Sequence, residues 1–449
     1  MGISSPSALP LPDPHLIQIH VLSSLDRFWP GGAAHLKSVP VAILKSLPRI
    51  EPPLRLVSVM LPDWACKDGV NGQILIPAEA QGRADFEGKT SWQNVDWFLA
   101  AFLMLECWHE RIWEFKHGPI HSYSFRLKDW DARVWSHAWV NRIALFLRRW
   151  AAKIQNTAPE RLFGSLPEST VCMTHDVDAV EKTLAIRLKQ SAFNGINALR
   201  WLARGRSKES IRCVRQGLRF LFGKEDWWHL DHLLAMEAVA NIKSLFYFYA
   251  DLRPKSLIRW LFDPGYNIKQ PRIKALIAEL LDQGHQTGLH SGFETWSDPK
   301  EIAKQKSNLE RITCKPVTAC RQHWLRFSWQ ATWASQQQAG IRLDNTLMFN
   351  DRPGFRNSSA LRWRPWNVKI NTQYQLTAQP TVLMDSQLYD YEPLSDAKRG
   401  SQMRYWLSEC QTAHGEMAVL WHPHTLTPDY GWKGGFSELL TAITHMRQP

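Results

Sequence analysis

From residue 166 onward, short apolar segments alternate with helical ones, and this alternation limits the folds open to the chain. The segments with the length and composition of strands are 170–175, 244–250, 286–290, 316–321, 341–346, 381–385 and 416–422. Between two of them, residues 271–284 predict a helix, with Pro271 in the first turn, one apolar stripe, and Gly284 as the stop. Such alternation is typical of a mainly parallel sheet or barrel, so the sequence predicts an α/β fold.

The first 165 residues follow another pattern and are expected to form an N-terminal accessory domain. They are punctuated by proline and contain a helical stretch from Val95 to about Trp113. Short apolar runs precede that stretch at 41–48, 54–61 and 73–77. Pro, Gly and Ser gather at 156–170, which places the expected boundary there. The two domains are therefore predicted as 1–165 and 166–449.

The composition excludes several classes of protein. The longest apolar run, Trp97 to Leu105, has nine residues, whereas a membrane-spanning helix needs about 20. The N-terminal stretch lacks the basic segment and apolar segment of a secretory signal, so a cytoplasmic location is expected. Seven cysteines are scattered without a C-x-x-C pair, which argues against a disulfide framework and against a cysteine-rich zinc site.

The positive charge is concentrated in one segment. The chain carries a net charge of +12, and residues 181–224 alone hold eleven Lys or Arg against two Glu, a local charge of +9. Within this segment an apolar helical stripe, Ile211, Val214, Leu218 and Leu221, runs beside a stripe of Arg212, Arg215 and Arg219. Two interpretations remain open: a helical insertion packed on the barrel, or a surface that meets anionic lipid or acidic glycan. The lack of a zinc-finger or RNA-binding signature argues against nucleic acid.

Polar groups follow four of the predicted strands, at 174–178, 288–294, 320–327 and 419–424. In parallel α/β architectures the chemistry gathers beyond the carboxyl ends of the strands. Together these segments supply two Asp, at least three His and at least one Arg. They predict a site for metal-assisted hydrolysis, with ligands, a spare carboxylate base and a histidine acid.

Strand alternation places Asp176 and Asp178 on one side of the first strand, and His175 on the other. His175 is therefore expected to be structural, and His424 is interpreted in the same way.

The order of these motifs resembles that of the polysaccharide deacetylases of the NodB-homology superfamily, carbohydrate esterase family 4. The matching elements are Thr174-x-Asp176-x-Asp178, Gly284-His285-x-x-Gly288-x-His290, Arg321, and Leu420-Trp421-His422. The elements GHQTGLH and RQHWLR are most similar to the branch found with bacterial surface-polysaccharide biosynthesis, as are the helical residues 97–110 and GFR at 354–356. The resemblance implies a distorted (β/α) barrel of about seven strands.

The resemblance also implies roles for single residues. Asp176 matches the catalytic base and Asp178 a metal ligand, while His290 matches the first metal histidine. Arg321 matches the arginine that holds the base, and His422 the histidine that protonates the leaving amine. Mixed histidine and carboxylate ligation favours zinc as the divalent metal.

Two departures from the family pattern leave alternatives open. Val177 separates the two aspartates, so the base and ligand roles of Asp176 and Asp178 could be exchanged. Glu294 stands where a second histidine is usual, four residues after His290. The third ligand could be His323, Glu294 or His285, and His323 is preferred because it lies just past a strand end.

The expected function is a metal-dependent hydrolase that removes an N-acetyl or other acyl group from a sugar. Its partner would be an N-acylated sugar within a polysaccharide or a glycan precursor. Because the usual second histidine is missing, the alternative is a non-catalytic glycan-binding or scaffold protein on a degenerate deacetylase barrel. Peripheral contact with a membrane through residues 181–224 would be compatible with either.

Overall fold

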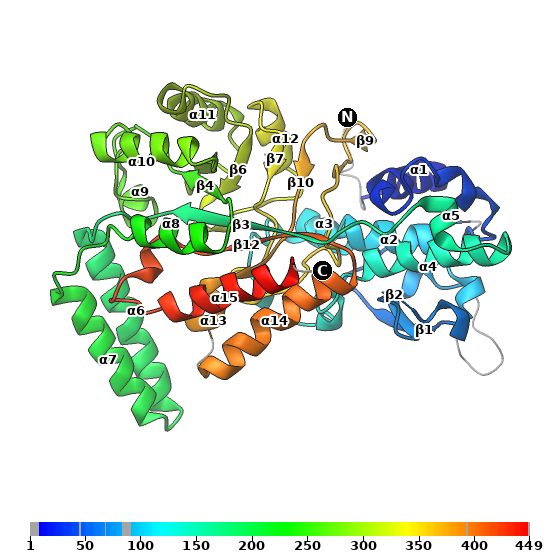
Figure 1. Cartoon of the computed structure of the whole chain (residues 1–449), viewed down its shortest axis with the longest axis horizontal. Coiled ribbons are helices and arrows are strands. Elements are labelled where there is room, and N and C mark those ends of the chain that lie inside the picture. The colour runs from blue at the N-terminus through cyan, green and yellow to red at the C-terminus, as the bar shows by residue number, and fades with distance from the viewer. Residues whose placement is uncertain (1–8, 45, 68, 83–90, 392–393, 448–449) are drawn as a thin grey trace, which may run out of the picture. The chain divides into compact units, whose positions relative to one another are not determined.

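The computed structural model describes residues 9–44, 46–67, 69–82, 91–391 and 394–447. Its largest sheet has the strand order β10-β7-β6-β5-β4-β3-β12-β11 (Figure 1). The strands are β3 (Thr170–Val177), β4 (Leu245–Phe248), β5 (Gln286–Ser291), β6 (Ala319–Gln322), β7 (Leu343–Asp344), β10 (Thr377–Ala378), β11 (Thr381–Met384) and β12 (Glu416–Leu420). The pairs β3–β4, β4–β5, β5–β6 and β7–β10 are parallel. The predicted α/β fold is therefore confirmed.

This sheet has eight strands, one more than the sequence predicted. The additional strand is β10, which has only two residues. A segment so short leaves no period-2 pattern in the sequence. The order ends at β10 and β11, in keeping with a distorted barrel.

The chain divides into two compact units. Unit 1 comprises residues 1–172, 324–393 and 402–419, and unit 2 comprises 173–323, 394–401 and 420–449. The predicted accessory domain of residues 1–165 stays a prediction, because compactness groups that segment with later parts of the chain.

Unit 1 is built around α2, whose nine residues are all buried. Its helices are α1 (Pro14–Ser24), α2 (Trp97–Leu105), α3 (Trp108–His117), α4 (Trp139–Ile154), α5 (Pro159–Phe163), α12 (Thr332–Gln338) and α13 (Asp385–Tyr389). Its small antiparallel pairs are β1 (Leu56–Met60) with β2 (Gln73–Pro77), and β8 (Trp366–Asn367) with β9 (Thr372–Gln373). The single helical stretch expected from Val95 to Trp113 is divided, since Cys107 has a left-handed φ of 46°. The turn there lets Glu106 enter a buried ion pair with Arg111.

Unit 2 carries most of the helices that flank the central strands. They are α6 (Leu184–Ala203), α7 (Ser207–Phe222), α8 (Leu230–Val239), α9 (Leu257–Phe262), α10 (Pro271–Asp282), α11 (Pro299–Thr313) and α15 (Lys433–Met446), while α14 (Asp396–Thr412) belongs partly to each unit. Helix α10 begins at Pro271 and ends before Gly284, which has a φ of 83°, as the sequence predicts. In the described part of the chain, each helix is too short or too polar to cross a bilayer.

The basic segment forms α6 and α7, which pack against each other. Helix α7 contacts the rest of unit 2 through Phe220, which packs with Ala179 and Trp227. The apolar stripe noted in the sequence does not make this contact, because Ile211, Val214 and Leu218 are all exposed. Of the two interpretations left open by the sequence, packing of this stripe on the rest of the fold does not hold for these three residues. Phe220, on another side of α7, takes that place.

Candidate metal centre

The predicted site residues come together within unit 2 at the carboxyl ends of neighbouring strands. Asp176 lies near the end of β3 and Asp178 just beyond it, while His290 lies in β5. The parallel register pairs His290 with Arg321 of β6, and His323 follows that strand at once. On the other side of β3, the Trp421 N–H donates to the Thr174 carbonyl over 3.0 Å, which brings the next residue, His422, to the same edge.

Asp178, His290 and His323 form a compact cluster of potential metal ligands. One ligand atom from each lies within 4.8 Å of the others. Oδ1 of Asp178 is 3.1 Å from Nε2 of His290 and 3.5 Å from Nε2 of His323. Both imidazoles are buried, whereas the Asp178 side chain is 25% exposed. The cluster is therefore enclosed on the histidine side and reachable from the aspartate side.

Each of the two histidines is oriented by a contact of its Nδ1, the ring nitrogen that points away from Asp178. Nδ1 of His290 lies 3.0 Å from the Arg321 carbonyl, and Nδ1 of His323 lies 3.2 Å from a carboxylate oxygen of Asp263. Both partners are acceptors, so in each neutral ring Nδ1 carries the hydrogen and Nε2 presents a lone pair. Two lone pairs thus point toward Oδ1 of Asp178.

This arrangement fits a divalent metal ion. Three electron-pair donors that converge on one small space need a cation among them. Oδ1 of Asp178 is also buried, and it accepts no hydrogen bond from the residues that the structure describes. Two imidazole nitrogens and one carboxylate oxygen are the donor set of many catalytic zinc sites, in which a fourth position stays open. His323 thus completes a set to which Glu294 and His285 do not belong.

The electrostatics of the cluster favour a bound cation. Burial alone would raise the pKa of the Asp178 carboxyl, but His323 and His290 hold that pKa well below its usual range. Burial would likewise lower the pKa of His290, yet Asp176 and Asp178 raise it. The carboxylates of Asp176 and Asp178 thus favour positive charge at Nε2 of His290, which either a proton or a metal ion can supply.

A second carboxylate stands beside the cluster and is held by a buried arginine. Arg321 donates from one guanidinium nitrogen to Oδ1 of Asp176, at 2.9 Å, and from another to Oγ1 of Thr174, also at 2.9 Å. Its guanidinium lies 4.7 Å from the ring centre of Tyr247. Oδ2 of Asp176 is 3.8 Å from Nε2 of His290. Asp176 is therefore fixed by one oxygen and presents the other toward the cluster.

Glycine at position 288 makes room for the contact between the Arg321 guanidinium and the Tyr247 ring. A Cβ atom on Gly288 would meet the Tyr247 ring at 2.6 Å, far inside van der Waals contact. Gly288 is the register partner of Tyr247, so its missing side chain leaves room for the ring beneath Arg321.

His422 lies beside the other carboxylate oxygen of Asp178. Its Nε2 is 3.6 Å from Oδ2, whereas His290 and His323 lie near Oδ1, and its side chain is 14% exposed. It is not part of the compact group formed by Asp178, His290 and His323. The geometry therefore separates His422 from the three candidate ligands.

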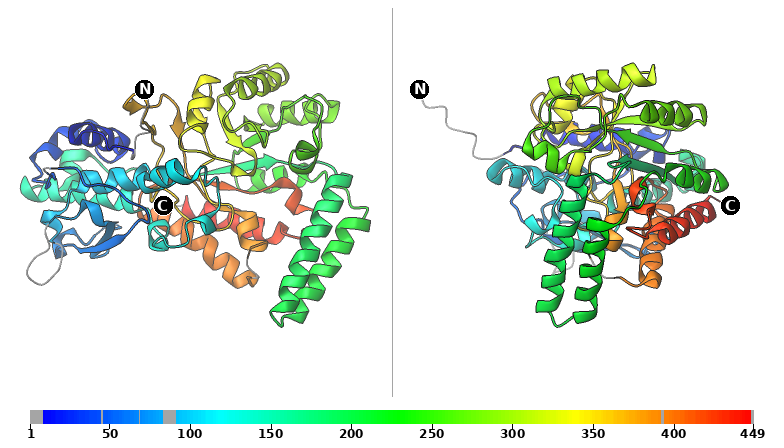
Figure 2. Two further views of the ribbon diagram at one scale, coloured as in Figure 1. Left: turned by 180° about the vertical axis from the view of Figure 1, so that it is seen from behind. Right: turned by 90° about the vertical axis from the view of Figure 1, so that its left-hand side faces the viewer.

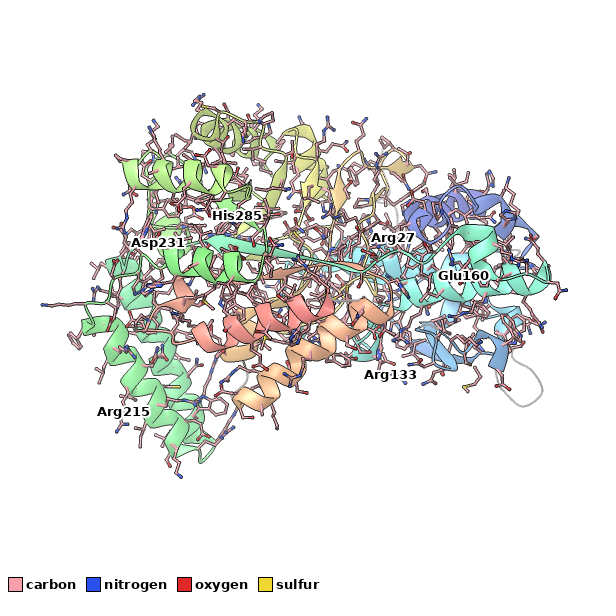
Figure 3. All side chains as sticks on the ribbon, in the orientation of Figure 1. Arg27, Arg133, Glu160, Arg215, Asp231 and His285 are labelled. Atoms are coloured by element: carbon pink, nitrogen blue, oxygen red, sulfur yellow. The ribbon has the colours of Figure 1, made fainter. Side chains whose placement is uncertain are left out.

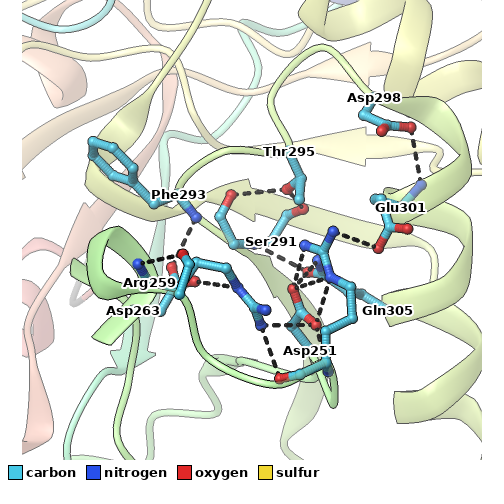
Figure 4. A network of polar contacts seen from close by, with 12 residues as sticks. Asp251, Arg259, Asp263, Ser291, Phe293, Thr295, Asp298, Glu301 and Gln305 are labelled. Atoms are coloured by element: carbon cyan, nitrogen blue, oxygen red, sulfur yellow. Dashed lines mark hydrogen bonds and ion pairs between the residues drawn. The ribbon is translucent and has the colours of Figure 1, made fainter. Parts of the chain in front are cut away.

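Asp263 is a site residue that the sequence analysis missed. It lies directly after α9, and its Oδ1 accepts the Phe293 N–H at 2.8 Å (Figure 4). The same oxygen lies 3.2 Å from Nδ1 of His323. Burial raises its pKa, but His323, the Phe293 N–H and the Tyr249 hydroxyl together more than offset this, so the pKa is lowered overall. The segment Asp263-Pro264-Gly265 reads as an ordinary turn, so no periodicity or strand end pointed to it.

The remaining histidines near the motifs have structural partners. His175 is buried, with one ring nitrogen 2.8 Å from Glu237 and the other 2.6 Å from the Trp421 carbonyl. His285, labelled in Figure 3, accepts the Ser244 N–H at 3.0 Å and precedes the amino end of β5, away from the site. The ring of His424 stacks on Trp227. Glu294 is exposed.

Comparisons with known proteins find similarity among solved structures, at low sequence identity. No protein family model matches the chain, and no curated protein matches it. A protein of Mycobacterium smegmatis, provisionally assigned as a polysaccharide deacetylase, is 17% identical over 63% of this chain and 87% of its own, with a TM-score of 0.38. A peptidoglycan N-acetylglucosamine deacetylase is 12% identical over 62% of this chain and 82% of its own, at 0.28. A carbohydrate esterase family 4 pseudoenzyme from Bacillus anthracis is 12% identical over 62% and 61%, at 0.26. TM-scores this low carry no argument, so the function rests on the site itself.

Proposed function

We propose that the chain is a metal-dependent carbohydrate deacetylase, which hydrolyses an N-acetyl or other acyl group on a sugar of a polysaccharide or its precursor. The observation that supports this most is the convergence of Asp178, His290 and His323 beside a second carboxylate that a buried arginine holds. Two imidazoles and one carboxylate are ligands suited to zinc. The neighbouring Asp176 has the position that a general base requires.

Zinc held by Asp178, His290 and His323 would supply a Lewis acid for the acyl carbonyl and would lower the pKa of water at the site. Asp176 accepts the proton of the attacking water as its oxygen bonds to the acyl carbon. Arg321 keeps the Asp176 carboxylate in place. His422 donates a proton to the leaving nitrogen as the carbon–nitrogen bond breaks, so the products are a carboxylate and an amino sugar.

The assignment of Asp176 as base and Asp178 as ligand is supported by their different surroundings. Oδ1 of Asp178 lies close to Nε2 of both His290 and His323. Asp176 instead accepts a hydrogen bond from Arg321. The sugar substrate is supported by the motif order from Thr174 to His422. The alternative of a non-catalytic glycan-binding protein was motivated by a missing histidine, and His323 lies where it can serve as the third ligand.

The test combines metal content with turnover. Zinc-loaded protein should release acetate from N-acetylated chito-oligosaccharides, and Asp176→Asn should lower that rate by about 10² to 10⁴ while zinc is retained. An O-acetylated sugar tested in parallel distinguishes amide from ester substrates. If the zinc-loaded protein binds these sugars but releases no acetate from either, the chain is a glycan-binding protein.

A further inference from the structure

Helices α6 and α7 form an antiparallel hairpin, seen side by side in both views of Figure 2. Arg187 near the start of α6 donates to the Leu221 carbonyl near the end of α7, at 2.9 Å. Further along, Ser191 donates to the Gly217 carbonyl at 2.8 Å. A Cβ on Gly217 would lie in ordinary van der Waals contact with Asn194, at 3.4 Å, so the two helices are closely packed at this point. The hairpin is therefore held together by polar contacts and small residues, and its large apolar side chains are left for other contacts.

Each helix of the hairpin presents a stripe of large apolar side chains to solvent. The members are Leu184, Leu188, Leu199 and Leu202 on α6, and Ile211, Val214, Leu218 and Phe222 on α7. Their exposed fractions range from 48% to 71%. The spacings are four, eleven and three residues on α6, and three, four and four on α7. With 3.6 residues per turn, such spacings keep each set on one side of its helix.

The two stripes lie on the same face of the hairpin. Ser191 and Ala198 mark the side of α6 that packs on α7, and Ser210 and Gly217 mark the side of α7 that packs on α6. At about 100° per residue, the apolar stripe is rotated from this packed side in the same direction on both helices, by about 55° on α6 and about 95° on α7. Because the two helices are antiparallel, rotations in the same direction bring both stripes to the same face of the hairpin. Contiguous exposed apolar surface of this kind marks an interaction site.

Basic residues flank this apolar face along the outer edge of α7. Lys208, Arg212 and Arg215 are exposed, and Arg215 is labelled on α7 in Figure 3. Arg219 lies on the same side but is partly neutralised, because its Nε is 3.4 Å from Asp429. An apolar face bordered by cations is the pattern of helices that lie in the interface of an anionic membrane.

We propose that the apolar face of the α6–α7 hairpin docks on an anionic phospholipid bilayer, with its basic edge against the lipid headgroups. A second copy of the chain fits this surface less well, since two copies of residues 181–224, each with a charge of +9, would face each other. Nucleic acid would satisfy the cations but would leave the apolar stripes without a partner. The proposal does not depend on the deacetylase activity.

The experiment is sedimentation of the full-length protein with vesicles of phosphatidylglycerol and phosphatidylcholine, compared with phosphatidylcholine alone. Wild-type protein should bind the anionic vesicles more tightly, and the difference should shrink as salt is added. The variant K208Q/R212Q/R215Q should lose affinity for anionic vesicles by up to about 100-fold, since each cation contributes on the order of 1 kcal/mol. The variant L199S/L202S/I211S should lose affinity for both kinds of vesicle by at least about tenfold, because apolar burial contributes to each.

A matched control keeps the result specific to the hairpin. The variant K300Q/K304Q/K315Q removes three exposed cations at α11 and just after it, and it should retain wild-type binding. Equal binding of wild type and K208Q/R212Q/R215Q to anionic vesicles would overturn the proposal. So would a wild-type dimer in solution that L199S/L202S/I211S converts to monomer, because the face would then be a contact between copies. Circular dichroism of each variant checks that α6 and α7 remain folded.

Discussion

Two buried clusters of acids and histidines, one in each unit, differ in how completely their hydrogen bonds are satisfied. In unit 1, Oε1 of Glu106 is 2.8 Å from Nε2 of His20 and accepts the indole N–H of Trp363 at 3.0 Å. Oε2 accepts from Arg111 at 2.5 Å and from the Trp366 N–H at 3.0 Å. In unit 2, Oδ1 of Asp178 accepts no hydrogen bond from any described residue.

The number of hydrogen bonds that each carboxylate accepts distinguishes the structural cluster from the candidate functional one. The direction of the pKa shift does not. Burial opposes ionisation of both carboxyls, and in both the neighbouring cations lower the pKa. The direction of the shift is thus the same for Glu106 and Asp178. What differs is that Glu106 has a partner for each oxygen, whereas Asp178 leaves a place where another cation belongs.

The largest effect is expected from a histidine pair that contrasts catalysis with stability. His422 lies 3.6 Å from Asp178, whereas His20 is in hydrogen-bond contact with Glu106. His422→Ala should lower the rate on an amide substrate by about 10² to 10⁴ and leave zinc content unchanged. His20→Ala should instead lower the free energy of unfolding by about 1–3 kcal/mol, because it leaves Glu106 short of a partner. Rates, zinc analysis and urea denaturation of both variants provide the measurements.

An activated ester sharpens the assignment of His422. Its leaving group needs little protonation, so the loss in rate for His422→Ala should be much smaller than on the amide. Loss of zinc from this variant would make His422 a ligand, and an equal rate loss on both substrates would remove it from the acid role.

The two carboxylates themselves should respond in opposite ways to amide substitution. Asp178→Asn should weaken zinc binding by more than the roughly 10 to 100-fold typical of residues behind the ligands, while the protein remains folded. Glu106→Gln should leave zinc binding intact but destabilise the chain by about 3–5 kcal/mol, because it breaks a buried ion pair. Zinc titration and denaturation of each variant test the pair. Full zinc retention by Asp178→Asn would show that the ligand assignment is wrong.

The sequence predicted the parts of this site that lie on or just after regular strands. Asp176, Asp178, His290, Arg321 and His422 stand at strand ends, where period-2 alternation and motif order make positions readable. The choice among His323, Glu294 and His285 could not be made from spacing, because it depends on how the chain turns after β6. There His323 begins a short 3-10 turn in which Trp324 has a left-handed φ of 57°.

Contacts made through tertiary folding escaped the sequence analysis. Asp263 lies far along the chain from His323, and the two meet only because α9 packs beside the strand ends. In the same way, the periodicity of the sequence predicts the apolar stripe on α7, but it does not predict which side of the helix packs against the rest of unit 2. Phe220, outside that stripe, makes the buried contact.

A residue that contacts a candidate ligand, but is not itself one, should affect metal affinity less than Asp178 does. Asp263→Asn removes the charge that orients His323, so zinc affinity should fall by about 10 to 100-fold. Asp251→Asn is the matched control, since Asp251 is a neighbouring buried carboxylate that pairs with Arg253 and Arg259 instead (Figure 4). Competition of each variant with a zinc chelator gives the affinities. Equal losses in the two variants would mean that general disturbance of the network, and not the contact with His323, is responsible.

The smallest effect concerns a histidine of unit 1 whose surroundings are the reverse of those of His290. Burial, with help from Arg326, lowers the pKa of His121 from 6.5 to about 4, and Nε2 of His121 lies 3.2 Å from the Arg326 guanidinium. Between these two pKa values the unfolded chain binds more protons than the folded one, so stability should fall as the pH drops through 6.5 toward 4. His121→Asn should reduce the loss of Tm between pH 7 and pH 5 by about 1 °C, which corresponds to about 1 kcal/mol for a chain of 449 residues, after allowing for solvent at this partly exposed side chain. The exposed His15 provides the control, and an equal change in His15→Asn would show that His121 has no special part in the acid sensitivity of the fold.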